Sequence, residues 1–302
     1  MAEMIQEFEK YIRYELNYSA HTVSAYSNDL QMFEQWAFGN GSRHVDYASI
    51  GEDDVRQWIM QRSLQHDNTT TLRRRLQSVR AFFRFLRKRG IVSSNPAHDV
   101  EMAKPRKRLP AYVREQNMDA LLNTEVDTAN YGEVMARTIV VMLYETGLRR
   151  AELIGLKDQN VDCSRMEMKV RGKRDKDRVV PFGNELKEWI ERYKALRQRE
   201  VGSGDGNFFL TAKGKPLYPS LIYRVVHENL LAAGGCSKQS PHVLRHSFAT
   251  AMLNGGASIN SVKEILGHES LAATQVYTHL AFGELKSNYQ QAHPRAQKKE
   301  VL

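Results

Sequence analysis

The sequence predicts a mainly α-helical protein of two domains, the second of which is mixed α/β, mostly helical with a small β-sheet. Before residue 103, apolar residues recur at the spacing of amphipathic helices. In the second half, the stretch from Met166 to Val180 reads as a strand, a charged turn and a second strand. The chain has 302 residues, which also favours two domains at about 150 residues each.

The N-terminal stretch, residues 1–103, contains about four helices by its apolar spacing. Each of them has a stripe of apolar side chains that we expect to be buried. Helix by helix, these are Ile5, Phe8 and Ile12; Tyr26, Leu30 and Phe33; Val55 and Ile59; and Leu72, Leu76, Val79, Phe83 and Leu86.

The fourth predicted helix, roughly Thr71 to Arg89, is strongly basic outside its apolar stripe. A charged helix face is usually a solvated surface of mixed sign, but this helix contains no acidic residue. Such a face repels itself unless phosphates lie near it, so we favour a helix that faces DNA. The expected contacts are Arg73, Arg74, Arg75, Arg80 and Arg84.

A short segment at residues 104–110 divides the chain. Its two prolines and its basic run make a poor helix and a suitable linker over DNA phosphates, through Arg106, Lys107 and Arg108. An ordinary solvated connector is the alternative, but the position between two periodic regions favours a hinge. We therefore expect an N-terminal DNA-binding domain in 1–103, a linker in 104–110 and a C-terminal catalytic domain in 111–302.

The candidate catalytic residues are basic and aromatic: Arg149, Lys173, His242, Arg245, His268 and Tyr277. Cleavage of a phosphodiester spreads extra negative charge over its non-bridging oxygens, and a guanidinium donates paired hydrogen bonds to two of them. A tyrosine helped by a base or by cations can attack the phosphorus, and a lysine with a lowered pKa can protonate the leaving oxygen. No carboxylate cluster accompanies these residues, so the pattern indicates covalent tyrosine chemistry on DNA without a metal.

Local patterns place two of these side chains on one helix. Ser240 reads as an N-cap and Pro241 as the first helical residue. His242 and Arg245 are three residues apart and therefore share a face of the first turn. Free N–H groups and the helix dipole favour an anion there.

Two glycines mark helix ends beside the other candidates. Gly147 reads as a left-handed cap before Arg149, and Gly267 ends a helix just before His268. Glu152 lies three residues after Arg149, where it is placed to hold the guanidinium.

Taken singly, these residues have simpler interpretations. Arg149 could be a surface charge, His268 a helix cap and Tyr277 a half-buried core residue. Lys173 shares its charged turn with Lys176, and chemistry alone leaves open which of the two is the acid. Taken together, the residues favour the catalytic interpretation.

A metal site is the alternative for His242 and His246, which are four residues apart. Arg245 lies between them and no HExxH glutamate is present, so we give this alternative little weight.

The composition agrees with a polyanionic partner. The net charge is +9 and the pI about 9.4, while 41% of the residues are hydrophobic, enough for ordinary cores. Cys163 and Cys236 suggest no disulfide framework and a reducing compartment. No signal peptide and no stretch long enough to span a bilayer is visible, so we expect a cytoplasmic protein without a membrane partner.

Four motifs resemble the tyrosine recombinase (phage-integrase) family: residues 146–153, 172–173, 242–250 and 266–279. All of the family's usual catalytic positions are filled, and the resemblance covers almost the whole chain. The stretch from Ser19 to Phe33 resembles the family's core-binding domain, and the tail from Ala292 to Ala296 is closer still to the Xer subgroup. Any one motif alone is weak, but their joint order and spacing are very specific.

The resemblance implies a helical SAM-like core-binding domain and a tyrosine recombinase catalytic domain that clamp duplex DNA. The resemblance implies that Tyr277 is the nucleophile and forms a 3′-phosphotyrosine, and that Arg149 and Arg245 bind the phosphate. It implies that His242 and His268 donate hydrogen bonds to the phosphate, with His242 the better candidate for the base. Lys173 would protonate the leaving 5′ oxygen. A second 5′ hydroxyl reverses the step without ATP, so no metal and no cofactor are expected.

The resemblance also implies a DNA recombination site as substrate and a homo- or hetero-tetramer with a related recombinase. The segment from Glu284 to His293 would dock in a neighbouring subunit. An Xer-type role in resolving chromosome dimers at cell division is favoured, with a cell-division DNA translocase as partner and a nucleoid-associated location in a bacterial cytoplasm. The alternatives are an integrase of a phage or mobile element, a non-catalytic DNA-binding protein and a type IB topoisomerase.

Overall fold

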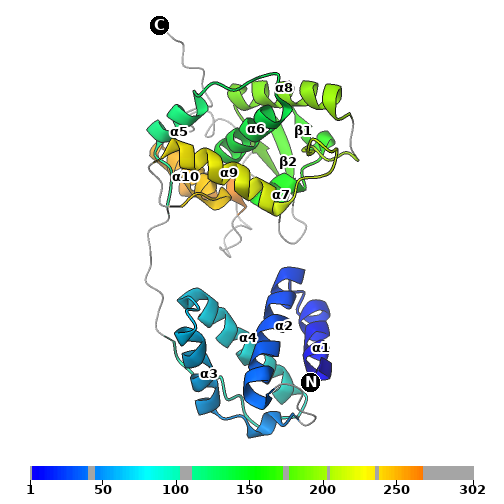
Figure 1. The fold of residues 1–302 in the computed structure, drawn as a ribbon, viewed down its shortest axis with the longest axis vertical. Coiled ribbons are helices and arrows are strands. Elements are labelled where there is room, and N and C mark those ends of the chain that lie inside the picture. The colour runs from blue at the N-terminus through cyan, green and yellow to red at the C-terminus, as the bar shows by residue number, and fades with distance from the viewer. Residues whose placement is uncertain are drawn as a thin grey trace. The chain divides into compact units, whose positions relative to one another are not determined.

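The structure is a computed structural model that describes residues 2–39, 45–102, 111–172, 177–202, 205–234 and 238–267. Its internal contacts divide the chain into two units, Met1–Arg108 and Leu109–Leu302 (Figure 1). Each unit is described by itself. The predicted linker, 104–110, lies outside the described residues.

The N-terminal unit is helical, as predicted. Its elements are α1 (Ala2–Lys10), which continues into a π-helical turn (Tyr11–Glu15), α2 (Ala20–Phe38), a 3₁₀ turn (Tyr47–Ser49), α3 (Glu52–Leu64) and α4 (Thr69–Lys88). Side chains cap the two longest helices. The Ser19 hydroxyl accepts from the Thr22 N–H at 3.2 Å, and the Asn68 amide oxygen accepts from the Thr71 N–H at 2.8 Å.

The apolar stripes predicted for the four helices are all buried and form the core of this unit. Aromatic rings fill its centre, where the Phe82 ring packs edge-on against Phe8, Tyr47 and Phe83. The basic residues of α4 are divided between this interior and the surface: Arg75 is buried, whereas Arg73 and Arg84 are exposed.

The C-terminal unit is built around one buried helix. Its helices are α5 (Glu115–Leu122), α6 (Tyr131–Thr146), α7 (Arg150–Ile154), a 3₁₀ turn (Asp158–Asn160), α8 (Asn184–Glu200), α9 (Pro219–Ala233), α10 (Pro241–Asn254) and α11 (Ile259–Leu266). Every residue of α6 from Ile139 to Thr146 is buried. Helix α8 packs on one side of α6, and α9 and α10 pack on the other (Figure 1).

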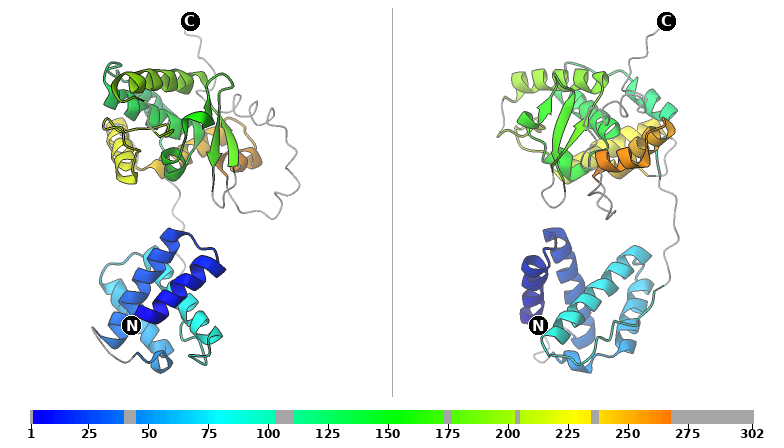
Figure 2. Two further views of the ribbon diagram at one scale, coloured as in Figure 1. Left: turned by 90° about the vertical axis from the view of Figure 1, so that its right-hand side faces the viewer. Right: turned by 180° about the vertical axis from the view of Figure 1, so that it is seen from behind.

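A three-stranded antiparallel sheet completes this unit, in the order β1 (Val161–Asp162), β2 (Glu167–Arg171) and β3 (Asp177–Pro181). Figure 2 shows it at the side of the unit, next to the orange helix α11. In the register, Met168 lies opposite Val161 on one side and Val180 on the other. The two predicted strands are confirmed, and the charged turn between them, residues 173–176, lies outside the described residues. β1 was not predicted because two residues cannot show an alternating pattern. No helix in the described part of the chain could cross a membrane.

Candidate functional site

Two of the predicted phosphate-binding arginines meet at the C-terminal end of α11. The Arg245 guanidinium donates to the carbonyl of Gly147 at 2.6 Å and to the carbonyl of Leu266 at 2.7 Å. Arg149 donates to the carbonyl of Gly267, the next residue along, at 2.8 Å. Residues more than 90 positions apart in the sequence are thus brought to one place by the ends of α6 and α11.

Gly147 makes this meeting possible. As predicted, it is the left-handed C-cap of α6, with φ 61°. A Cβ at this position would lie 2.6 Å from Phe248 Cδ1 and 2.7 Å from Leu266 Cδ2, closer than any real contact. Both the backbone conformation and the available space therefore require glycine, and the close approach of α10 and α11 depends on it.

Arg149 is held by Glu152, as predicted from their spacing. Arg149 is the residue before α7, and Glu152 lies in the first turn of that helix. The carboxylate accepts from the Arg149 backbone N–H at 2.8 Å and from its guanidinium at 2.7 Å. The side chain of Arg149 is 32% exposed and that of Glu152 only 5%, so the guanidinium is anchored from the protein side and keeps access to solvent.

A third arginine, Arg178 of β3, joins this cluster and was missed by the sequence analysis. It forms a bidentate pair with Glu152, at 2.8 and 2.9 Å, and its Nε donates to the carbonyl of Ile265 at 2.6 Å. Burial alone raises the pKa of Glu152, but hydrogen bonds and charge from Arg178 and then Arg149 outweigh it and lower the pKa below its ordinary value. Glu152 is therefore ionised at neutral pH.

The electrostatics of the cluster favour an anion. Arg245 is only 6% exposed. Burial, followed by the positive charge of Arg149, lowers the pKa of Arg245 to about 10, so the Arg245 guanidinium stays charged at neutral pH. Since Glu152 already pairs with Arg149 and Arg178, the mutual repulsion of Arg149 and Arg245 would be relieved by a phosphate bound to both.

His242 lies in the first turn of α10, where Ser240 is the N-cap residue and Pro241 is the first helical residue, as predicted. The Ser240 side chain itself makes no capping bond. The His242 side chain reaches solvent, yet partial burial lowers its pKa, and the charges of His246 and of Arg150, Arg245 and Arg149 lower it further. The imidazole is therefore neutral at neutral pH and able to accept a proton.

Three further candidates, Lys173, His268 and Tyr277, lie outside the described residues. So does Lys176, the alternative acid. In the sequence, Lys173 follows Gly172, just after β2, and His268 follows Gly267, whose carbonyl accepts the bond from Arg149. Of the catalytic set, the structure thus brings together Arg149, Arg245 and His242.

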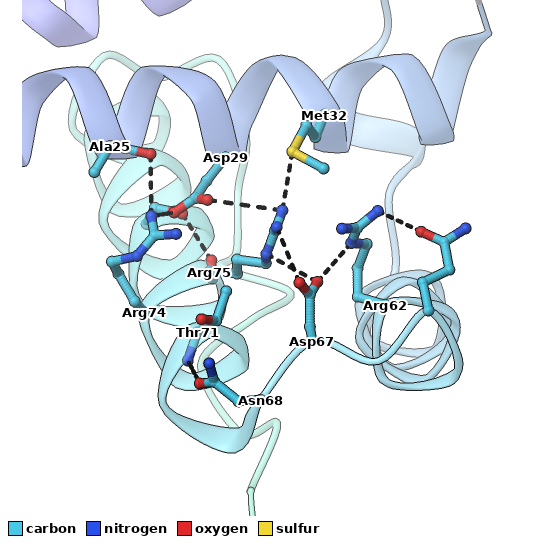
Figure 3. Close-up of polar contacts among 11 residues, drawn as sticks. Ala25, Asp29, Met32, Arg62, Asp67, Asn68, Thr71, Arg74 and Arg75 are labelled. Atoms are coloured by element: carbon cyan, nitrogen blue, oxygen red, sulfur yellow. Dashed lines mark hydrogen bonds and ion pairs between the residues drawn. The ribbon is translucent and has the colours of Figure 1, made fainter. Parts of the chain in front are cut away.

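In the N-terminal unit, two arginines of the predicted DNA-facing set have acidic partners from outside α4 (Figure 3). Arg74 pairs with Asp29 of α2 and also donates to the Ala25 carbonyl at 3.2 Å. Arg75 is buried and pairs with Asp29 at 3.8 Å and with Asp67 at 3.2 Å. Part of the charge on α4 is therefore neutralised within the protein.

Of the other three arginines predicted on α4, one bonds to the protein interior and two are exposed. Arg80 is turned inward, with its Nε donating to the Ala97 carbonyl at 2.7 Å and a second bond going to the Val100 carbonyl. Arg73 and Arg84 are exposed on the surface of α4. Predicted contacts in the linker, Arg106, Lys107 and Arg108, lie outside the described residues.

Metal ligands are not gathered anywhere in the part of the chain that the structure describes: no three His, Cys, Asp or Glu side chains lie where they could hold one ion. His242 and His246, the sequence alternative for a metal, have no third such neighbour among those residues.

Comparisons with known proteins identify the family. The phage integrase family matches residues 111–284, and the phage integrase N-terminal SAM-like domain matches residues 5–90. A tyrosine recombinase XerC of Mycobacterium sp. (strain KMS) is 38% identical over 305 residues, which cover 98% of this chain and 100% of that protein.

Two solved structures share the fold. XerH site-specific recombinase bound to a palindromic difH substrate has a TM-score of 0.70 at 18% identity, over 95% of this chain and 84% of that one. The Tn1549 transposon integrase in complex with transposon right end DNA has a TM-score of 0.69 at 19% identity, over 95% and 98%. With the family matches, these findings show that the chain belongs to the phage integrase family of tyrosine recombinases, which are DNA strand-exchange enzymes.

Proposed function

We propose that this protein cuts and rejoins DNA at specific sites, with Tyr277 as the nucleophile and Arg149 and Arg245 as the phosphate-binding pair. The observation that carries the proposal is the arrangement of the two guanidiniums. They donate to the consecutive carbonyls of Gly267 and Leu266, and are thereby fixed side by side. Fixed donors of this kind are the largest catalytic contribution in many transfers to and from phosphate.

The bonds that fix the two arginines leave hydrogen-bond donors for the phosphate. A guanidinium has five N–H groups. The side chain of Arg149 uses one for Glu152 and one for Gly267, and Arg245 uses one each for Gly147 and Leu266. The remaining N–H groups can bind the non-bridging oxygens and stabilise the charge that grows on them in the transition state.

The proton transfers are assigned to the other members of the set. The Tyr277 oxygen forms a bond to phosphorus while the bond to the 5′ oxygen breaks, giving a 3′-phosphotyrosine. His242, which is neutral at neutral pH, takes the tyrosine proton. Lys173 gives a proton to the leaving 5′ oxygen, and His268 adds a hydrogen bond to the phosphate. In the second half of the reaction a new 5′ hydroxyl attacks the phosphotyrosine, and the transfers run in reverse.

DNA binding by the N-terminal unit is assigned to the exposed part of the basic helix. Arg73 and Arg84 are exposed on α4 and are proposed to contact phosphates. The linker residues Arg106, Lys107 and Arg108 are proposed to contact phosphates as well. Arg75 and Arg80 are instead assigned to the folding of the unit, because their guanidiniums are committed to Asp29, Asp67 and backbone carbonyls.

The biological role that we propose is Xer-type resolution of chromosome dimers at cell division, in a bacterial cytoplasm and on the nucleoid. The identity of 38% to a XerC over almost the full length supports it. The active form would be a tetramer on two DNA sites, alone or with a related recombinase, activated by a cell-division DNA translocase. An integrase of a mobile element is the second candidate, because the transposon integrase has the same fold.

A recombination assay tests this role. Two copies of the chromosomal dimer-resolution site of the source bacterium are placed on one plasmid, and deletion of the DNA between them is measured with the protein alone and with its related recombinase. The proposal expects deletion that is lost in Tyr277→Phe. Deletion only between attachment sites of an integrated element would instead establish the second candidate.

A further inference from the structure

Three arginines converge on the last turn of α11. Arg178 donates to the carbonyl of Ile265 at 2.6 Å, Arg245 to that of Leu266 at 2.7 Å, and Arg149 to that of Gly267 at 2.8 Å. The last carbonyls of a helix have no partner within the helix and carry its negative dipole end, so cations bind there favourably. The turn therefore acts as a common anchor for guanidiniums from β3, from α10 and from the start of α7.

Glu152 provides a second link between two of the three. Its carboxylate binds both guanidinium nitrogens of Arg178, at 2.8 and 2.9 Å, and the guanidinium of Arg149 at 2.7 Å. The side chains of Arg178 and Glu152 are 12% and 5% exposed. Arg178 is thus connected to Arg149 by two routes, one through Glu152 and one through the turn of α11.

We propose that Arg178 is a positioning residue for strand exchange: it fixes Glu152 and the end of α11, and through them it holds Arg149 and Arg245 where the scissile phosphate binds. The inference rests on the proposed function of Arg149 and Arg245. Arg178 itself is not expected to touch DNA, because all three of its guanidinium nitrogens bond to protein groups and its side chain is almost buried.

Only an arginine can make these contacts at this position. The bidentate pair with Glu152 needs two parallel N–H groups, and the bond to the Ile265 carbonyl needs a third N–H from the same side chain. A lysine keeps the charge but offers a single ammonium that cannot satisfy both partners. Arg178→Lys is therefore the informative substitution, since it preserves the charge and removes the geometry.

The test is single-turnover cleavage of a nicked duplex that carries a recombination site, measured beside the affinity for the same DNA. We expect Arg178→Lys to lower the cleavage rate roughly 100-fold, the cost of a small displacement of catalytic groups. DNA affinity should stay close to that of the unchanged protein. Arg178→Gln is measured as a second variant, and all rates are taken well below the melting temperature of each variant.

Arg197→Lys is the matched control. Arg197 of α8 is also buried, also forms a bidentate pair with a carboxylate, Asp158 at 2.9 and 3.0 Å, and also donates to backbone carbonyls. None of its partners belongs to the site. Arg197→Lys should therefore cost stability without a comparable loss of cleavage rate.

A double-mutant cycle separates positioning from general weakening. If Arg178 acts through Arg149, the rate losses of Arg178→Lys and Arg149→Lys will not multiply in the double variant. Losses that multiply fully, a normal rate in Arg178→Lys and Arg178→Gln, or a loss no larger than that of Arg197→Lys would each overturn the inference. A normal rate in Arg149→Lys would instead show that the proposed function itself is wrong.

Discussion

The carboxylate of Glu152 accepts two hydrogen bonds from Arg149, one from its backbone N–H at 2.8 Å and one from its guanidinium at 2.7 Å. The first bond satisfies a free N–H at the start of α7, and the second orients the side chain. The same carboxylate therefore caps the N-terminus of α7 and orients the Arg149 guanidinium. Glu152 is buried and also pairs with Arg178, so its negative charge balances two arginines, Arg149 and Arg178.

Glu152→Gln should therefore destabilise the C-terminal unit. The change leaves Arg149 and Arg178 facing each other without an anion, and breaking a buried ion pair of this kind costs about 3 kcal/mol. We take the lower end of the usual range because Arg149 is 32% exposed. Urea unfolding measures the effect. Glu191→Gln is the control, since its pair with Lys187 is exposed and should change the free energy of unfolding by less than about 1 kcal/mol; equal effects would contradict the account.

Gly147→Ala should destabilise more than an ordinary substitution at positive φ. The backbone strain costs about 1–2 kcal/mol, and the new methyl group would overlap Phe248 and Leu266, adding roughly 1–3 kcal/mol of overpacking. Gly206→Ala isolates the first contribution, because Gly206 has φ 70° with nothing within 4 Å of its Cβ position. Thermal unfolding of the two variants compares them. A smaller loss at position 147 than at 206 would show that the contact between α10 and α11 is not tight.

His242 should make the folded protein less stable in mild acid. Its pKa is lowered on folding from the ordinary value of 6.5, so the unfolded chain binds more protons between the two values. The contribution to stability is complete above pH 6.5 and is lost as the pH falls through 6.5 toward the folded pKa. His242→Gln should remove this part of the pH dependence. Urea unfolding series of both proteins across this range measure it, and identical curves would refute the assignment.

Arg84 and Arg75 should behave in opposite ways, although both lie on α4. Arg84→Ala removes an exposed charge and should weaken DNA binding, lowering the salt dependence of the binding constant by about one counterion. Arg75→Ala removes the buried partner of Asp29 and Asp67, which keep only the more exposed Arg74 and Arg62, and should cost about 2 kcal/mol of stability. Binding titrations at several salt concentrations and unfolding curves of both variants decide the matter; the reverse pattern would mean that the assignment of these side chains is mistaken.

The parts of the fold that sequence predicts well are local. The stripes of α1 to α4, the caps at Gly147 and Gly267 and the pair of Arg149 with Glu152 each depend on residues within a few turns of one another. Helical periodicity and spacing are enough to find them.

The parts that sequence does not predict depend on distant contacts. The uniformly basic sequence of α4 gave no sign that Arg74 pairs with Asp29, which lies 45 residues earlier in the chain. Likewise nothing in the local pattern of β3 indicates that Arg178 reaches Glu152, or that carbonyls of α11 collect arginines from three elements. Such contacts are made by tertiary packing, which no periodicity encodes.

Tyr277 is proposed to form a covalent bond to the DNA phosphate that Arg149 and Arg245 bind. Covalent trapping tests it most directly: the protein is incubated with a nicked duplex carrying a recombination site, with EDTA present, and denaturation-resistant protein–DNA adducts are isolated and mapped by mass spectrometry. We expect an adduct at Tyr277 that is absent in Tyr277→Phe and greatly reduced in Arg149→Lys and Arg245→Lys, while DNA binding persists. An adduct at another residue, or none on a site that the protein binds, would contradict it.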